Sequence, residues 1–232
     1  MIIPVFIPHL GCPNQCVFCN QKTITGMGEG KVSVEAARLE IENWLLRSAP
    51  GTLHELAFYG GSFTALPSAL QMQYLELAQS FRKQGRIQNL RLSTRPDAID
   101  TEHLKTLKAF GVSRIELGAQ SFDDRVLSMS KRGHSVRDIE MASARILEAD
   151  IDLGLQLMVG LPGDSSMTDL KGVSEAFRLK ATTLRIYPTL ILKGTPLEKM
   201  HLEGHYVPLT LEAAVQRVAH MMEAVDALNA AN

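Results

Sequence analysis

Hydrophobic positions along this 232-residue chain follow two alternating spacings. Short apolar runs predict six strands, and longer segments with apolar residues three and four positions apart predict a helix after each strand. The predicted strands are 2–7, 56–59, 90–94, 115–118, 153–159 and 183–192. The predicted helices are 34–47, 68–83, 101–110, 136–148, 167–178 and 211–228.

A strand followed by a helix, six times over, predicts an α/β fold with a parallel sheet and outer helices. The simplest architecture is a partial (β/α)6 barrel of the TIM-like kind, and a doubly wound open sheet is the alternative. The strands carry few polar residues before their C-terminal ends, as expected when both faces of a sheet are covered.

Helix ends are also marked in the sequence. Ser135 with Asp138, and Ser166 with Asp169, have the spacing of an N-terminal capping box. A glycine, Gly85 or Gly111, follows two of the predicted helices and suits their C-terminal ends.

Composition limits the classes of function. The hydrophobic content of 45% is that of a globular protein, and the net charge of −1 provides no overall field toward nucleic acid or membranes. No run of about 18 apolar residues predicts a membrane span. The N-terminus lacks the positive segment of a secretory signal, and reduced thiols suit a cytoplasmic location.

The three cysteines lie within eight positions, at Cys12, Cys16 and Cys19. Thiolates are the usual ligands of iron–sulfur clusters, which normally take four. Three would leave one iron of a 4Fe–4S cluster open, as a reactive metal site requires. A disulfide would leave one cysteine over, and a structural zinc would need a fourth ligand, for which His9 is the nearest candidate.

Other chemistry-bearing segments follow the later predicted strands, where the reactive face of a parallel α/β fold lies. They are Gly60-Gly61-Ser62, Arg95, Gln120-Ser121 and 160–163.

The pattern CxxxCxxC, with Phe18 before the last cysteine, resembles the mark of the radical S-adenosylmethionine (radical SAM) superfamily. The resemblance spans nearly the whole chain and is nearest to the radical SAM half of the Elongator catalytic subunit and its short bacterial relatives. The stretches that carry it are 58–64, 93–97, 131–134 and 185–195. Oxygen-independent coproporphyrinogen oxidase and its haem-chaperone relatives are similar at a greater distance.

The resemblance implies two cofactors, a 4Fe–4S cluster held by the three cysteines and S-adenosylmethionine (SAM) on the open iron. It also implies that Gly60, Gly61 and Ser62 receive the methionine amino group. Arg132, twelve residues after Gln120, would clamp the methionine carboxylate, the alternative being a surface arginine beside Lys131.

Five further positions follow from the same resemblance. Gln156 stands where relatives carry an aspartate to the ribose, and Ser93 where they carry an acidic residue near the amino group. Arg95 either substitutes for that contact or pairs with Asp97. Tyr187 either faces the cavity or belongs to the core, and Phe18 is expected to shield the cluster or the adenine.

The implied activity is reductive cleavage of SAM to a 5′-deoxyadenosyl radical that abstracts hydrogen from a substrate. The substrate stays open between a tRNA nucleoside and a small molecule, and a reductant such as flavodoxin or ferredoxin is the expected electron donor. A non-catalytic tetrapyrrole carrier that binds cluster and SAM is the alternative. We expect residues 1–232 to form one radical SAM core domain, truncated before a C-terminal extension.

A second histidine pair does not favour a metal site. His201 and His205 are four apart with Glu203 between them, but Gly204 and Pro208 argue against a continuous helix.

Overall fold

The computed structural model of the chain describes residues 1–7, 12, 16–20, 33–49 and 51–231. Six parallel strands form one sheet in the order β1-β2-β3-β4-β5-β6. The strands are β1 (Ile2–Phe6), β2 (Glu55–Tyr59), β3 (Asn89–Thr94), β4 (Val112–Gln120), β5 (Asp152–Val159) and β6 (Thr183–Pro188). The strand order follows the chain order, without the reversal that defines a doubly wound sheet. The sheet curls into a half-barrel, which confirms the predicted partial TIM-like fold.

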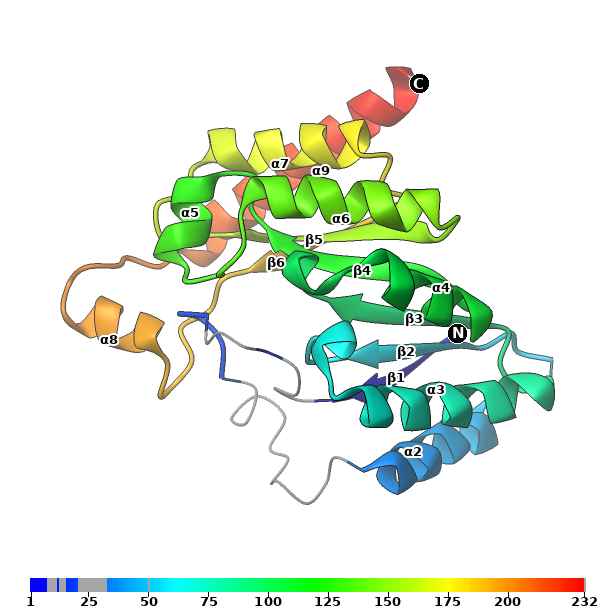
Figure 1. Ribbon diagram of the computed structural model, residues 1–232. Helices are drawn as coiled ribbons and strands as arrows, with labels where there is room; N and C mark the ends of the chain where they lie inside the picture. The colour runs from blue at the N-terminus through cyan, green and yellow to red at the C-terminus, as the bar shows by residue number, and fades with distance from the viewer. Residues whose placement is uncertain (8–11, 13–15, 21–32, 50, 232) are drawn as a thin grey trace.

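Helices follow the strands, and most of them pack around the outside of the sheet, whereas one short helix, 196–202, lies beyond the C-terminal ends of the strands (Figure 1). They are α2 (Val34–Arg47), α3 (Ser68–Lys83), α4 (Thr101–Ala109), α5 (Asp124–Met129), α6 (Val136–Glu148), α7 (Ser166–Arg178), α8 (Pro196–Leu202) and α9 (Leu211–Ala231). Two 3-10 turns, η2 (Phe63–Ala65) and η3 (Pro96–Ala98), follow β2 and β3. None of the helices in the described ranges combines the length and apolar character needed to cross a membrane.

Three predicted helices, 34–47, 68–83 and 136–148, have the observed bounds. The prediction missed α5 and α8, which are six and seven residues long and too short to show a helical repeat. The predicted strand 183–192 was too long, because β6 ends at Pro188. A proline nitrogen donates no hydrogen bond to a neighbouring strand, so a strand commonly ends at a proline.

The capping predictions had mixed outcomes. Ser135 and Asp138 form the predicted box at the start of α6. At α7 the prediction was wrong by one residue, since Ser165 and Thr168 make the box there. Gly85 and Gly111 do follow α3 and α4, with positive φ angles of 69° and 87°.

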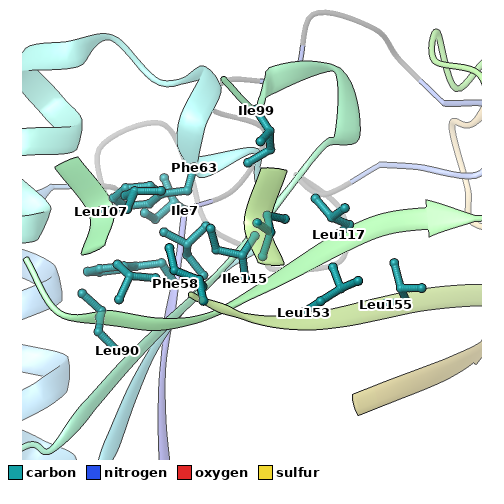
Figure 2. Packing of buried hydrophobic residues seen from close by; sticks show 14 of the residues in the cluster. Ile7, Phe58, Phe63, Leu90, Ile99, Leu107, Ile115, Leu117, Leu153 and Leu155 are labelled. Carbon is teal, nitrogen blue, oxygen red and sulfur yellow. The ribbon is translucent and has the colours of Figure 1, made fainter. Parts of the chain in front are cut away.

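The main hydrophobic core lies between the outer face of the sheet and the helices. Alternate residues of β1 to β5 point into it and are almost fully buried, while those of β6 are partly buried; Figure 2 shows part of this packing. Among them are Phe58, Leu90, Ile115, Leu117, Leu153 and Leu155. Each such side chain contributes roughly 1.5–3 kcal/mol by leaving water.

The opposite face of the sheet is polar, which corrects the expectation that both faces would be apolar. Arg91, Glu116, Gln156 and Arg185 lie in mid-strand, on the face that alternates with the core positions. The half-barrel leaves this face lining a cavity, where charged groups can remain if they pair with one another.

The last helix, α9, is held by a buried ion-pair cluster. Arg217 donates from Nε to Asp169 at 2.5 Å and from Nη1 to Asp164 at 3.0 Å. The side chain of Arg217 is 11% exposed, that of Asp169 is 4% exposed and that of Asp164 is 6% exposed. Burial raises the pKa of Asp169, while Arg217 pulls that pKa down. Asp169 lies one residue after Thr168, which completes the capping box of α7, and its side chain pairs with Arg217 instead.

Replacing Arg217 should therefore destabilise the protein strongly. We expect Arg217→Met to cost about 3–5 kcal/mol, because two buried carboxylates lose their cation. The matched control is Arg178→Met, since Arg178 also pairs with two glutamates but is 51% exposed. Chemical denaturation should show a loss below about 1 kcal/mol for that control. Equal losses of unfolding free energy in the two variants would contradict the stabilising role of the buried Arg217 cluster.

Candidate active site

A cavity of about 910 Å³ opens at the C-terminal ends of the strands and extends along the inner face of the half-barrel. Its walls come from all six strands and from the cysteine segment. The lining includes Cys12, Cys16, Phe18, Cys19, Gly60, Gly61, Ser93, Arg95, Gln120, Arg132, Gln156 and Tyr187. Every predicted site residue except Ser62 therefore lies on this one cavity.

The cysteine segment is fixed by contacts on two sides. The Val17 nitrogen donates to the Ser130 carbonyl at 3.2 Å, and the Val17 carbonyl accepts from Leu197 at 2.8 Å. Val17, Leu197 and Tyr206 form a second, small hydrophobic core, against which Phe18 packs. The segment after β6, which includes α8, thus forms a support for the cysteines.

The three cysteines share the cavity without converging on a single point. In the described ranges no three His, Cys, Asp or Glu side chains lie close enough to grip one metal ion. A single zinc requires such convergence, with Zn–S distances of about 2.3 Å. A cluster of several irons takes each thiolate at a different iron and does not require it. His9, the fourth zinc ligand considered above, lies outside the described residues.

Two arginines influence the thiols electrostatically. Burial raises the pKa of the Cys12 thiol, while the positive charges of Arg95 and Arg132 pull that pKa back down. The arginines thus favour the thiolate form that binds metal.

The turn after β2 brings backbone to the cavity wall. Gly60 has a φ of 93°, and a Cβ there would lie 3.4 Å from a ring carbon of Phe6. Ser62 is fully buried behind the wall, where its hydroxyl pairs with Thr94 at 2.9 Å and accepts from the Arg95 nitrogen at 3.2 Å. Its side chain supports the turn.

Arg132 is buried, which rules out the surface alternative. It is 7% exposed, and its Nη1 donates to the Cys16 sulfur at 3.0 Å. Its Nη2 donates to the Gly118 carbonyl at 2.6 Å. A Cβ at position 118 would lie 3.2 Å from that Nη2, so a larger residue there would displace the guanidinium by a few tenths of an ångström.

Arg95 pairs with Asp97, as one of the two predictions for it proposed. Its Nε and Nη2 donate to the two carboxylate oxygens at 2.9 and 3.0 Å. Nη2 also donates to the Arg132 backbone carbonyl at 2.5 Å, which ties the third strand to the turn that carries Arg132.

Gln120 ends β4 in a strained backbone conformation, with a φ of 69°. Its side-chain oxygen is buried and accepts no hydrogen bond from the described residues. Strain and an unpaired buried acceptor cluster at binding sites, where a ligand supplies the missing partner.

A charged network forms the floor of the cavity. Glu116, 1% exposed, accepts from Arg185 at 3.0 Å and from Arg91 at 3.1 Å. Tyr59 donates to the same carboxylate at 3.2 Å and lies beneath the Arg185 guanidinium, 4.9 Å from ring centre to Cζ. Burial raises the pKa of Tyr59, and Glu116 raises it further. Glu116 thus pairs with two arginines at once, and Glu55 supplies a second negative charge to Arg91.

The Glu116 network also fixes the amide of Gln156. Its Nε2 donates to Glu116 at 3.0 Å and to the Ser93 hydroxyl at 3.1 Å. Both amide hydrogens are therefore used, and the amide oxygen is left to accept. Tyr187 is 40% exposed and lines the cavity, so it is not a core residue.

Sequence reasoning missed several cavity residues. They are Pro4, Phe6, Asn20, Tyr59, Thr94, Gly118 and Arg185. It also missed Glu116, although a charged residue between Ile115 and Leu117 in a predicted strand was a usable signal. The histidine pair is not a joint site, since α8 ends at Leu202 and the ring of His201 bonds the Tyr206 carbonyl.

Comparison with known proteins decides the family. The model of the radical SAM superfamily matches residues 6–168, about 70% of the chain. The chain belongs to the radical SAM superfamily. A second model, the Radical_SAM C-terminal domain, matches residues 181–227. The single-domain expectation stays a prediction.

Relatives of this radical SAM protein carry names from tRNA modification. A tRNA uridine(34) acetyltransferase of Dehalococcoides mccartyi is 28% identical over 89% of this chain and 52% of its own length. Elongator complex protein 3 of Saccharomyces cerevisiae is 26% identical over 74% of this chain and 34% of its own. The chain thus spans about half or less of these relatives.

Solved structures share the fold. An archaeal Elp3 from Methanocaldococcus infernus superposes with a TM-score of 0.76 at 23% identity, over 95% of this chain and 53% of that one. Coproporphyrinogen III oxidase from Escherichia coli gives 0.66 at 18% identity, over 96% of this chain and 52% of that one. Structures from both families that the sequence motifs resemble therefore share the fold of this chain.

This radical SAM chain is an enzyme whose cofactors are those of its superfamily, a 4Fe–4S cluster and SAM. The residues present suit them. Three cysteines line one cavity, a close-packed glycine turn borders it, and Gln120 presents a buried oxygen without a partner in the described ranges.

Neutralising Glu116 should destabilise the inner face. We expect Glu116→Gln to cost about 3 kcal/mol in chemical denaturation, because Arg185 then loses its carboxylate partner and Arg91 keeps only Glu55. Glu140→Gln is the matched control, since Glu140 pairs with Arg178 at the surface and is 42% exposed. A loss below about 1 kcal/mol in both variants would contradict the central role of Glu116.

Acid should destabilise the protein through His134. Burial, with the charge of Arg132, lowers the pKa of His134 from 6.5 to about 4. The unfolded chain therefore binds a proton near pH 6.5 that the folded chain refuses until about pH 4. About 3 kcal/mol of stability, present above pH 6.5, should be lost as the pH falls to 4.

The measurement is denaturation at a series of pH values for the wild type and His134→Gln. The variant lacks the titrating group, so its stability should fall less over this range. Parallel pH profiles would show that His134 does not contribute this dependence.

Proposed function

We propose that this chain assembles its 4Fe–4S cluster on Cys12, Cys16 and Cys19 and binds SAM in the cavity beside it. The observation that supports this proposal is the presence of all three cysteines and a glycine turn on one buried cavity. When bound and reduced, the cluster supplies the electron that cleaves SAM to methionine and a 5′-deoxyadenosyl radical, which abstracts hydrogen from a substrate.

The chain's own residues bind and orient the ligands. Gly60 and Gly61 would accommodate the methionine end of SAM through backbone contacts, since no side chain intervenes there. Gln156 would accept a hydrogen bond from a ribose hydroxyl, because its amide oxygen is the group left unused by Ser93 and Glu116. Phe18 and Tyr187 would flank the adenine and exclude water.

The substrate that the relatives favour is a tRNA nucleoside. Two relatives are named for tRNA uridine(34) acetylation or for Elongator, and each aligns with most of this chain. We do not extend acetyl transfer to this chain, because it covers 52% or less of those two proteins. The proposal is limited to a radical SAM step on the nucleoside, with electrons from a flavodoxin or a ferredoxin.

The test is product release by anaerobically reconstituted, reduced protein. It should contain iron and sulfide near four each per chain and should release 5′-deoxyadenosine and methionine from SAM. A tetrapyrrole carrier would hold cluster and SAM but release neither product. Stimulation by unmodified tRNA, and not by haem precursors, would support the proposed substrate.

Substitution of the cysteines tests the ligand assignment. We expect Cys12→Ala, Cys16→Ala and Cys19→Ala each to reduce cluster content and product release to background, while circular dichroism stays unchanged. His103→Ala serves as the control and should keep a full cluster, since His103 lies in α4, outside the cavity lining, and pairs with Asp100. A cysteine variant that retains four irons would remove that residue from the proposed ligand set.

A further inference from the structure

The guanidinium of Arg132 contacts the sulfur of a proposed cluster ligand. Nη1 of Arg132 donates to the Sγ atom of Cys16 at 3.0 Å. The two residues are 7% and 6% exposed. A buried cation is stable only with well-placed acceptors, so this contact is part of how Arg132 is accommodated.

The backbone and neighbouring residues hold Arg132 in this orientation. Its carbonyl accepts from Arg95 at 2.5 Å, and its Nη2 donates to the Gly118 carbonyl at 2.6 Å. The residues on either side, Lys131 and Gly133, have positive φ angles of 52° and 75°. This tight turn at the end of α5 directs the side chain back toward the cysteines.

We propose that Arg132 is a positioning residue that hydrogen-bonds the cluster-ligating thiolate of Cys16 and raises the reduction potential of the cluster. This inference rests on the proposed function, in which Cys16 is a ligand. Reduction adds negative charge that the sulfur ligands share, and a charged donor stabilises the reduced form more than the oxidised form. Arg132 would thus make the cluster easier to reduce.

The contact with Cys16 is compatible with the carboxylate clamp that the family resemblance implies. A clamp uses two parallel N–H groups of the guanidinium. In Arg132 each terminal nitrogen donates one hydrogen, to Cys16 or to Gly118, and keeps a second hydrogen. The remaining nitrogen, Nε, is buried and has no partner among the described residues. The contact with Cys16 therefore leaves N–H groups of the guanidinium available for a second acceptor.

The experiment is a redox titration of the cluster, followed by electron paramagnetic resonance without SAM, in wild type, Arg132→Met and Lys131→Met. At the wild-type midpoint, Arg132→Met should show a reduced-to-oxidised ratio about tenfold lower, which corresponds to about 59 mV for one electron. Lys131→Met removes the same charge one residue away, on an exposed side chain. Solvent screens that charge, so its ratio should change less than about twofold.

The outcomes separate this inference from the proposed function. An unchanged potential in Arg132→Met, with weaker SAM binding, would overturn the sulfur contact and favour the carboxylate clamp. Equal shifts in both variants would show a general charge effect and would also overturn it. A wild type that assembles no cluster, or a Cys16→Ala variant that keeps four irons, would instead contradict the proposed function.

A second measurement applies if Arg132→Met retains no cluster. The wild type, labelled with ¹⁵N in its arginine side chains, should show a weak nitrogen hyperfine coupling to the reduced cluster. Arg132→Lys should lose that coupling. Its absence in the wild type, or its persistence in Arg132→Lys, would overturn the inference.

Discussion

The alternation of side chains along six parallel strands governs the rest of this structure. One set of positions, exemplified by Ile115 and Leu153, is buried against the outer helices. The other set, exemplified by Glu116 and Arg185, faces the interior of the half-barrel. Because parallel strands run the same way, their carboxyl ends meet at one mouth, where segments distant in sequence share a cavity.

Electrostatics then determine what this inner face can hold. Glu116 balances Arg91 and Arg185, and Arg91 pairs in turn with Glu55, so the floor of the cavity is close to neutral. The mouth is different, because Arg132 and Arg95 lie near the cysteines. A positive environment at the mouth suits a cluster whose thiolate ligands and inorganic sulfides carry negative charge.

Much of the fold could be predicted from the sequence, because the spacing of apolar residues reflects which positions are buried. The bounds of α2, α3 and α6 follow from long amphipathic repeats. The short helices α5 and α8 were not legible, since each is shorter than two helical repeats. Their positions depend on tertiary contacts, such as that of Leu197 in α8 with Val17.

The candidate site was predictable to the same degree. A local motif identifies the three cysteines, positions after strands identify Gly60, Gly61, Arg95 and Gln120, and the family resemblance adds the other predicted cavity residues. The partners of those residues could not be predicted, because they depend on the register between strands. Gln156 lies opposite Arg185 in the sheet, and Ser93 lies opposite Glu116. This pairing between strands cannot be read from the sequence, and it produces the network that fixes the Gln156 amide.

The central claim is that three cysteines hold the cluster and leave one iron for SAM. Mössbauer spectroscopy of the ⁵⁷Fe-reconstituted wild type, with and without SAM, tests this claim most directly. The account predicts that SAM changes the signal of one iron in four, toward a higher coordination number, and leaves the other three unchanged. Four irons that do not respond to SAM, or a protein that binds no cluster, would contradict it.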